Sequence, residues 1–263
     1  MTEKIALWNT TIPEYLPDAD TPNRMTFYRA ENQAPAPAVV VLPGGAYAGR
    51  APHEGEPIAE FYQKQGFHAF VVDYRVAPNR YPAGLADVQR AIRLIRRHAS
   101  EWGVDPQRIF VCGFSAGGHL AASTAIITDD VSAIGDALDR ESFRPSGAIL
   151  CYPVISGQDE HGHIASHRCL LGERFEADRA ALSLQNRVNE QTVPCFIWHT
   201  AEDAVVPVVH SLMLAEKLAE YRIPYELHIF PRGYHGLGLS LDKPEYAPVS
   251  RWAGWSADWI RTF

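Results

Sequence analysis

The stretch RIFVCGFSAGGHL, residues 108–120, constrains the fold of this chain more than any other. Its first half is a short apolar run rich in β-forming residues, and Gly113-Phe114-Ser115-Ala116-Gly117 then matches the pattern G-x-S-x-G. In a sharp turn of this kind the serine has a strained backbone, and side chains at the two glycine positions would collide with the strand and helix that cross there. The stretch therefore predicts strand, turn and helix, with Ser115 at a helix N-terminus that favours developing negative charge.

Length and charge limit what can surround this turn. The 263 residues suffice for one large α/β domain, and we expect a single domain over residues 1–263. The net charge of −7, with both signs interspersed, predicts neither nucleic-acid nor membrane-surface binding. The first fifteen residues do not resemble a signal peptide, and no run of eighteen apolar residues occurs, so we expect a cytoplasmic protein without a membrane span.

Strand and helix patterns alternate along the chain. Strands are predicted at residues 4–8, 24–29, 38–42, 67–73, 109–112, 146–151, 194–200 and 225–230. Helices are predicted at residues 54–65, 83–98, 116–127, 208–221 and 249–261. This rhythm predicts an α/β fold with a mostly parallel central sheet and helices on both faces.

Two helices carry unusual side chains. The second predicted helix has four arginines in eight residues, which indicates either a surface that binds phosphate or nucleic acid or, as we favour in an acidic chain, a solvated face: Arg90, Arg93, Arg96 and Arg97. The last helix has three tryptophans on one stripe, for which packing against the sheet is favoured over stacking on sugars: Trp252, Trp255 and Trp259.

Chemically useful groups follow four of the predicted strands. In parallel sheets reactive groups gather at the carboxyl ends of strands. Gly44 and Gly45 can bring bare backbone N–H groups to a substrate oxygen, Ser115 is a nucleophile, Asp203 an acid and His235 a base. A serine hydroxyl needs such a base to remove its proton, and the base needs a carboxylate to fix its tautomer.

These residues lie in segments that together resemble the α/β-hydrolase family, and within it small esterases typified by acetyl xylan and other carbohydrate acetyl esterases. The segments are LPGGAY at Leu42, DYRVAP at Asp73, GFSAGGHLA at Gly113, HTAEDAVVP at His199 and HIFPRGYHG at His228. The resemblance implies an α/β-hydrolase fold and a catalytic triad in the family's chain order, with Ser115 as nucleophile, Asp203 as acid and His235 as base. It also implies that Gly44, Gly45 and Ala116 offer N–H groups to the oxyanion.

Some features depart from relatives of that family. Pro43 and Phe114 stand where the hormone-sensitive-lipase branch has a histidine and an aspartate, which points away from that branch. Ala46 replaces a glycine that acetyl esterases often have, although an alanine keeps its N–H.

Several other side chains compete for roles at the site. Glu202 adjoins Asp203, but Asp203 has the family's spacing to Val205-Val206-Pro207. His119 follows Ser115 by one helical turn and His199 lies within a predicted strand, so packing roles are favoured for both. Two further residues, Glu54 and Arg75, either brace the site or form plain surface ion pairs.

Two segments interrupt the alternation, residues 129–144 and 156–190. We expect them to form a small cap over the nucleophile and to shape substrate choice. The longer one contains His161, His163, His167 and Cys169, which invites a metal interpretation. No pair of histidines at helical spacing with a supporting carboxylate accompanies them, so neither a metal nor a cofactor is predicted.

Three classes of function remain open at this point. The leading one is a serine ester hydrolase for short acyl groups, with an acetylated sugar or another small ester inside the cell as substrate. The second is a serine peptidase of the prolyl-oligopeptidase type, which normally adds a large gating domain that this length does not accommodate. The third is a non-catalytic binding protein with a hydrolase fold. Self-association to a homo-oligomer is left open by the sequence.

Overall fold

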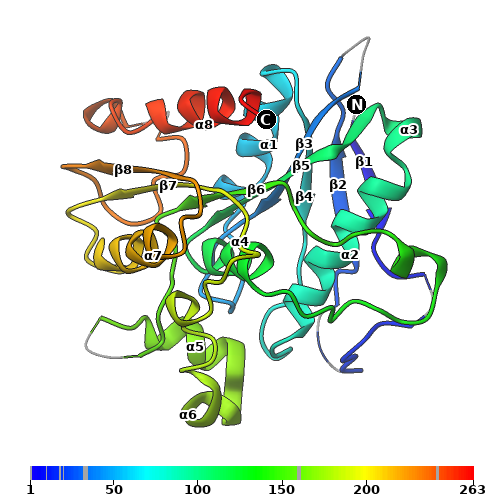
Figure 1. The fold of residues 1–263 in the computed structure, drawn as a ribbon, viewed down its shortest axis with the longest axis horizontal. Coiled ribbons are helices and arrows are strands. Elements are labelled where there is room, and N and C mark those ends of the chain that lie inside the picture. The colour runs from blue at the N-terminus through cyan, green and yellow to red at the C-terminus, as the bar shows by residue number, and fades with distance from the viewer. Residues whose placement is uncertain are drawn as a thin grey trace.

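The computed structural model describes residues 2–9, 11–17, 19, 21–31, 35–158, 161–240 and 243–263, and Figure 1 shows their arrangement. In these ranges eight strands form one sheet in the order β1-β2-β4-β3-β5-β6-β7-β8. Their bounds are β1 Thr2–Ala6, β2 Arg24–Tyr28, β3 Ala36–Leu42, β4 His68–Val72, β5 Val104–Phe114, β6 Gly147–Cys151, β7 Cys195–Thr200 and β8 Tyr225–Phe230. The pairs β1/β2 and β2/β4 are antiparallel, and every other pair is parallel.

Helices cover both faces of the sheet. One face packs against α1 (Glu56–Lys64) and α8 (Arg251–Arg261), and the other against α2 (Ala83–Arg97), α4 (Ala116–Ile126) and α7 (Val209–Glu220). Both faces of strand β3 are covered, which explains why its apolar run is continuous. Val40 packs on the side of α2, α4 and α7, and Val39 and Val41 pack on the side of α1 and α8. The predicted α/β architecture is thereby confirmed.

Most predicted elements occur within two residues of their predicted bounds. Strand β8 coincides with its prediction, while β1 begins two residues earlier and β5 extends back to Val104. The helix predicted from Glu54 is a short 3₁₀ turn, Pro52–Glu54, followed by α1. Three short helices were not predicted, α3 (Ala99–Trp102), α5 (Ile164–Leu171) and α6 (Phe175–Asp178); the last two lie at the bottom of Figure 1.

The arginine face of α2 differs from its prediction, because two of its guanidinium groups are buried rather than solvated. Arg90 and Arg93 are each 2% exposed. A nitrogen of Arg90 lies 2.5 Å from Asp136 Oδ2, and one of Arg93 lies 2.6 Å from Asp130 Oδ2. The segment 129–144 therefore packs along α2 and supplies the carboxylates that make burial of these charges tolerable.

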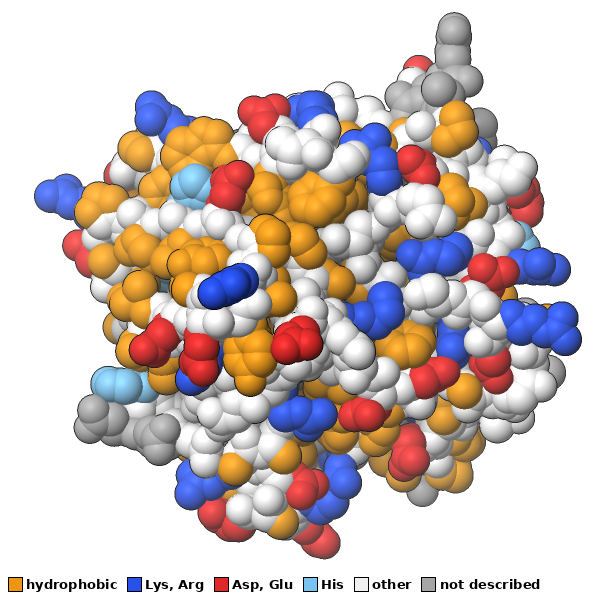
Figure 2. Space-filling model, in the orientation of Figure 1, with side chains coloured by type: hydrophobic (Ala, Val, Ile, Leu, Met, Phe, Trp, Pro, Cys, Tyr) orange, Lys and Arg blue, Asp and Glu red, His pale blue; other side chains and the backbone are white. Residues whose placement is uncertain are grey.

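The tryptophan stripe of α8 largely packs against the sheet, as predicted. Trp252 and Trp259 are buried, but Trp255 is 37% exposed and lies over Phe230 and His228 of the edge strand β8, with ring centroids 5.8 and 4.9 Å away. Figure 2 shows hydrophobic side chains gathered over the α8 and β8 side of the molecule. In the part of the chain that the structure describes, no helix is both long and apolar enough to cross a bilayer.

Candidate active site

Ser115 lies at the turn between β5 and α4, with φ 54° and ψ −116°. A Cβ atom at Gly113 would lie 2.1 Å from the carbonyl oxygen of Gly117, and one at Gly117 would lie 2.1 Å from that of Leu42. The predicted steric need for both glycines is therefore confirmed. The strained serine is held on both sides, because its N–H donates to Cys151 O at 3.0 Å and its carbonyl accepts from Val154 N at 3.0 Å.

The structure brings Ser115, Asp203 and His235 together at the carboxyl ends of β5, β7 and β8. His235 Nε2 lies 2.7 Å from Ser115 Oγ, and His235 Nδ1 lies 2.6 Å from Asp203 Oδ2. Asp203 is buried, whereas the His235 side chain keeps 15% of its surface exposed. The three side chains thus form one hydrogen-bonded chain whose histidine is partly exposed to solvent.

The carboxylate of Asp203 has more partners than the sequence indicated. Its Oδ1 accepts from the N–H groups of Val205 and Val206, both at 2.9 Å, and His199 Nε2 lies 3.4 Å from its Oδ2. Burial alone would raise the pKa of Asp203, but hydrogen bonds from His199, His235 and Val206 outweigh it and lower the pKa well below its usual range. Asp203 is therefore held as an anion beside the imidazole.

His199 and Glu202 support this arrangement from outside it. His199 is buried, donates from Nε2 to Val206 O at 2.8 Å and places Nδ1 2.8 Å from Ser211 Oγ. Glu202, the rival carboxylate, accepts instead from Gly233 N at 3.2 Å and so holds the turn that leads to His235. The contact between His199 and Asp203 was not predicted. Their four-residue spacing in the sequence was the only indication of it.

The glycine loop after β3 carries two of the three predicted oxyanion donors, Gly44 and Gly45. Gly45 has φ 132°, and a Cβ atom there would lie 2.4 Å from Gly49 O, so a glycine is required. Ala116 begins α4, and the first N–H groups of a helix have no partner within it. Gly44 differs from the prediction, because its N–H donates to Glu54 Oε2 at 2.8 Å and is therefore engaged.

Comparison with known proteins places this geometry in a family. A family model described as BD-FAE matches residues 25–218. The chain belongs to the BD-FAE family. Endo-1,4-beta-xylanase B of Butyrivibrio fibrisolvens is 40% identical over 78% of the chain, and acetylxylan esterase of Xylanibacter ruminicola is 32% identical over 77%. The aligned regions span only 33% and 41% of those two relatives.

A solved structure is similar over nearly the whole of both chains. The acetyl ester-xyloside bifunctional hydrolase of Caldicellulosiruptor lactoaceticus has a TM-score of 0.92 and 40% identity, and the match covers 99% of this chain and 96% of that one. The α/β-hydrolase fold that the motifs implied is thereby confirmed for this BD-FAE chain.

The two segments predicted as a cap lie at different places in this BD-FAE fold. Arg144, at the end of 129–144, donates to the carbonyl oxygens of Ala125 and Ile127, at the end of α4 remote from Ser115. Segment 156–190 instead reaches the first turns of α4, where His119 Nε2 donates to Leu182 O at 2.9 Å. That either segment forms a cap stays a prediction. The contacts favour this role for segment 156–190 over segment 129–144.

The histidines of the longer segment are engaged in hydrogen bonds. His163 Nδ1 lies 2.8 Å from Ser166 Oγ, and His167 Nε2 lies 3.2 Å from Leu182 O. His161 accepts a hydrogen bond at its carbonyl from His210 Nε2 at 2.7 Å. Among the residues that the structure describes, no group of three or more histidine, cysteine or acidic side chains could hold a metal ion.

Two buried histidines near this segment are held neutral. His119 Nδ1 accepts from Tyr47 OH at 2.8 Å, and His210 Nδ1 accepts from Ile155 N at 2.9 Å. A second ring proton on either histidine would sit on Nδ1 and point at the group that donates to it, so protonation is disfavoured. Burial is the main cause that lowers the pKa of His119 to about 3 and that of His210 to about 4.

We expect the free energy of unfolding to fall as the pH drops below about 6.5, because unfolded histidines then bind protons that folded His119 and His210 do not. Their contribution is fully present above the unfolded pKa and is lost as the pH falls toward the folded values. One pH unit below 6.5, each histidine should cost about 1.4 kcal/mol. Urea unfolding at a series of pH values measures this slope, and His119→Gln should reduce it. An unfolding free energy that stays level through this range would contradict the assignment.

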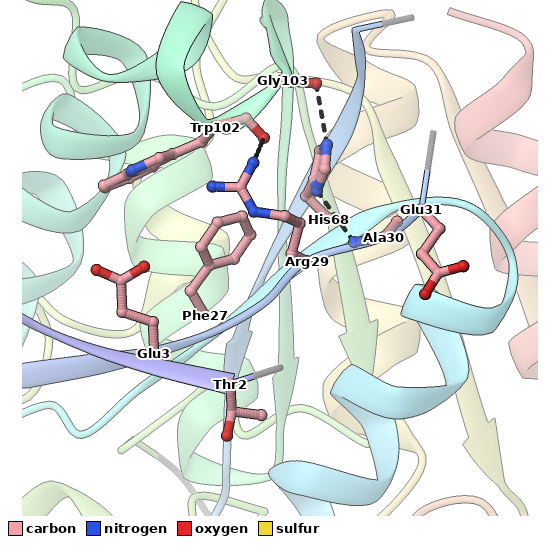
Figure 3. A pocket seen from close by; sticks show the side chains of 9 residues that line it. All are labelled: Thr2, Glu3, Phe27, Arg29, Ala30, Glu31, His68, Trp102 and Gly103. Atoms are coloured by element: carbon pink, nitrogen blue, oxygen red, sulfur yellow. Dashed lines mark hydrogen bonds between the residues drawn. The ribbon is translucent and has the colours of Figure 1, made fainter. Parts of the chain in front are cut away.

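Figure 3 shows a cavity whose volume is about 670 Å³, and Ser115 is not among the residues that line it. His68 begins β4 and Gly103 precedes β5, so the cavity is at the amino ends of the parallel strands, opposite the site. Its lining residues are Thr2, Glu3, Phe27, Arg29, Ala30, Glu31, His68, Trp102 and Gly103. Its polar groups are partly used within the fold, since Arg29 donates to Trp102 O at 3.0 Å and His68 Nε2 donates to Gly103 O at 2.9 Å.

Proposed function

We propose that this chain is a serine carboxylic ester hydrolase that removes short acyl groups, above all acetyl, from sugars or short oligosaccharides. The observation that carries the proposal is the hydrogen-bonded chain from Ser115 through His235 to Asp203, at 2.7 and 2.6 Å. The similarity of this protein to an acetylxylan esterase and to an acetyl ester-xyloside hydrolase supports the choice of substrate class.

The reaction follows from the positions of these groups. His235 Nε2 accepts the Ser115 hydroxyl proton as Oγ attacks the ester carbonyl, and Asp203 stabilises the imidazolium that forms. His235 then returns the proton to the leaving alcohol, which leaves an acyl-enzyme on Ser115. Water repeats the sequence and releases the acid.

The tetrahedral oxyanion needs N–H donors. Of the three backbone N–H groups predicted for this role, two are still proposed. Gly45 N–H and Ala116 N–H are the proposed donors, while Gly44 N–H is engaged by Glu54. Each oxyanion donor typically contributes about 3 kcal/mol to transition-state stabilisation. The start of α4 adds its partial positive charge at the same place.

We expect acetyl and propionyl nitrophenyl esters to be the best of an acyl-length series and decanoyl esters to be poor. A pocket that accepted long chains would gain about 0.8 kcal/mol per buried methylene, so rates would rise with length, whereas a short pocket excludes long chains sterically. The series should be measured beside acetate release from acetylated xylo-oligosaccharides.

Two results would redirect this proposal. A preference for octanoyl or longer esters, with no acetate released from the sugars, would reject the carbohydrate substrate and keep the ester hydrolase. Cleavage of a Pro-X amide would favour the peptidase alternative.

A further inference from the structure

Glu54 is a buried carboxylate within the site region that the reaction above does not use. It ends the 3₁₀ turn Pro52–Glu54 and is 2% exposed. Its Oε2 accepts from Gly44 N at 2.8 Å, and its Oε1 accepts from Tyr152 OH at 2.6 Å. The ring of His53 approaches only to 3.7 Å from Oε1 and is itself largely exposed. A carboxylate this deeply buried is tolerated because strong donors satisfy both of its oxygens.

On one side, this carboxylate fixes the glycine loop directly beside the nucleophile. A Cβ atom at Gly44 would lie 2.8 Å from Phe114 O and 3.0 Å from Ser115 Cβ, so the Gly44 backbone touches the turn that carries Ser115. Gly45 is the next residue, and its N–H is a proposed oxyanion donor. The hydrogen bond to Gly44 N–H therefore fixes the peptide group immediately before the one that presents this donor.

On the other side, the carboxylate reaches the loop that carries the base. Tyr152 OH, which donates to Glu54, also accepts from Gly238 N at 2.9 Å. The Tyr152 ring packs edge-on against the His235 ring, with centroids 5.0 Å apart and planes at 66°. Gly238 follows His235 by only three residues, so Tyr152 contacts both the imidazole and the backbone that positions it.

We propose that Glu54 is a positioning residue for this hydrolase, with Tyr152 as the link between its carboxylate and the base. One carboxylate thereby sets the separation between the proposed oxyanion donor Gly45, which follows β3, and His235, which follows β8. Glu54 touches neither the ester nor the reacting atoms. The inference deepens the proposed function and rests on it.

The test compares Glu54→Gln and Tyr152→Phe with Glu60→Gln, a matched loss of an exposed carboxylate on α1. In Glu54→Gln the amide can accept one of the two hydrogen bonds, but its NH₂ group then faces the other donor. We expect kcat for nitrophenyl acetate to fall about 100-fold while KM changes by less than about threefold, since a displacement near 1 Å has costs of this size. Tyr152→Phe should lose about tenfold, and Glu60→Gln should match the wild type.

A second measurement separates positioning from simple stabilisation. The rate at which a fluorophosphonate labels Ser115 should fall in step with kcat, at a temperature where circular dichroism shows each variant folded. If Glu54→Gln does not fold, Tyr152→Phe still decides, because it leaves the bond between Glu54 and Gly44 in place. Wild-type kcat and labelling rates in the folded variants would overturn the inference. A wild-type chain that hydrolyses no ester would instead overturn the proposed function, and the labelling rates alone would then decide the role of Glu54.

Discussion

Replacing Ser115 with alanine is expected to leave the fold intact and to lower ester hydrolysis by about a thousandfold or more. The substitution removes only Oγ, which lies 2.7 Å from His235 Nε2, so the covalent route disappears while binding and oxyanion contacts remain. Turnover of a purified variant should be measured with nitrophenyl acetate, with circular dichroism to establish folding.

The matched control for this substitution is Ser123→Ala on the same helix. Ser123 Oγ donates to His119 O at 2.8 Å, one helical turn back, and Ser123 lies eight residues beyond Ser115 along the chain. This variant should keep wild-type turnover. A Ser115→Ala protein that retained more than about a tenth of the activity would remove Ser115 from the proposed role.

The second large effect concerns stability. We expect Asp87→Ala to lower the free energy of unfolding by about 3 to 5 kcal/mol, because it strands a buried charge. Asp87 and Arg75 are 1% and 2% exposed, and Arg75 Nη2 lies 2.9 Å from Asp87 Oδ1. Asp87 also accepts from the Arg75 backbone N–H and from Trp8 Nε1, both at 2.8 Å. Chemical denaturation at neutral pH measures the loss.

An exposed ion pair of the same chain gives the comparison. Arg24 Nε lies 2.5 Å from Asp73 Oδ2, but the two side chains are 49% and 25% exposed. Arg24→Ala should therefore cost no more than about 1 kcal/mol. If Asp87→Ala cost as little, the burial of this pair would have no energetic consequence and the expectation would fail.

Local patterns predicted most of the sheet and the strand and helix on either side of Ser115. The apolar runs of β3 and β6 and the spacing of apolar residues in α2 depend only on near neighbours in sequence, so they could be identified directly. The collisions at Gly113 and Gly117 follow from the geometry of any turn of this type. The order of Ser115, Asp203 and His235 came from the family resemblance.

What could not be predicted depends on partners that are distant in sequence. Burial of Arg90 and Arg93 requires carboxylates about forty residues later, and an amphipathic pattern does not reveal them. The engagement of Gly44 N–H depends on Glu54 reaching back across the loop, and the role of Glu54 in turn depends on Tyr152, 98 residues away. The short helices α5 and α6 lack the periodic length that a helix prediction needs.

The burial of α4 has a consequence for how this molecule would lose its activity on heating. All eleven residues of α4 are buried, so we expect its amides to belong to the part of the structure that exchanges hydrogen only on global opening. Ser115 is anchored to that part. His235 follows β8, an edge strand whose residues are mostly exposed or half-buried. Local opening of this edge would withdraw His235 while Ser115 stayed in place, so on the proposed mechanism inactivation by heat should precede unfolding of the molecule as a whole and should be reversible on cooling.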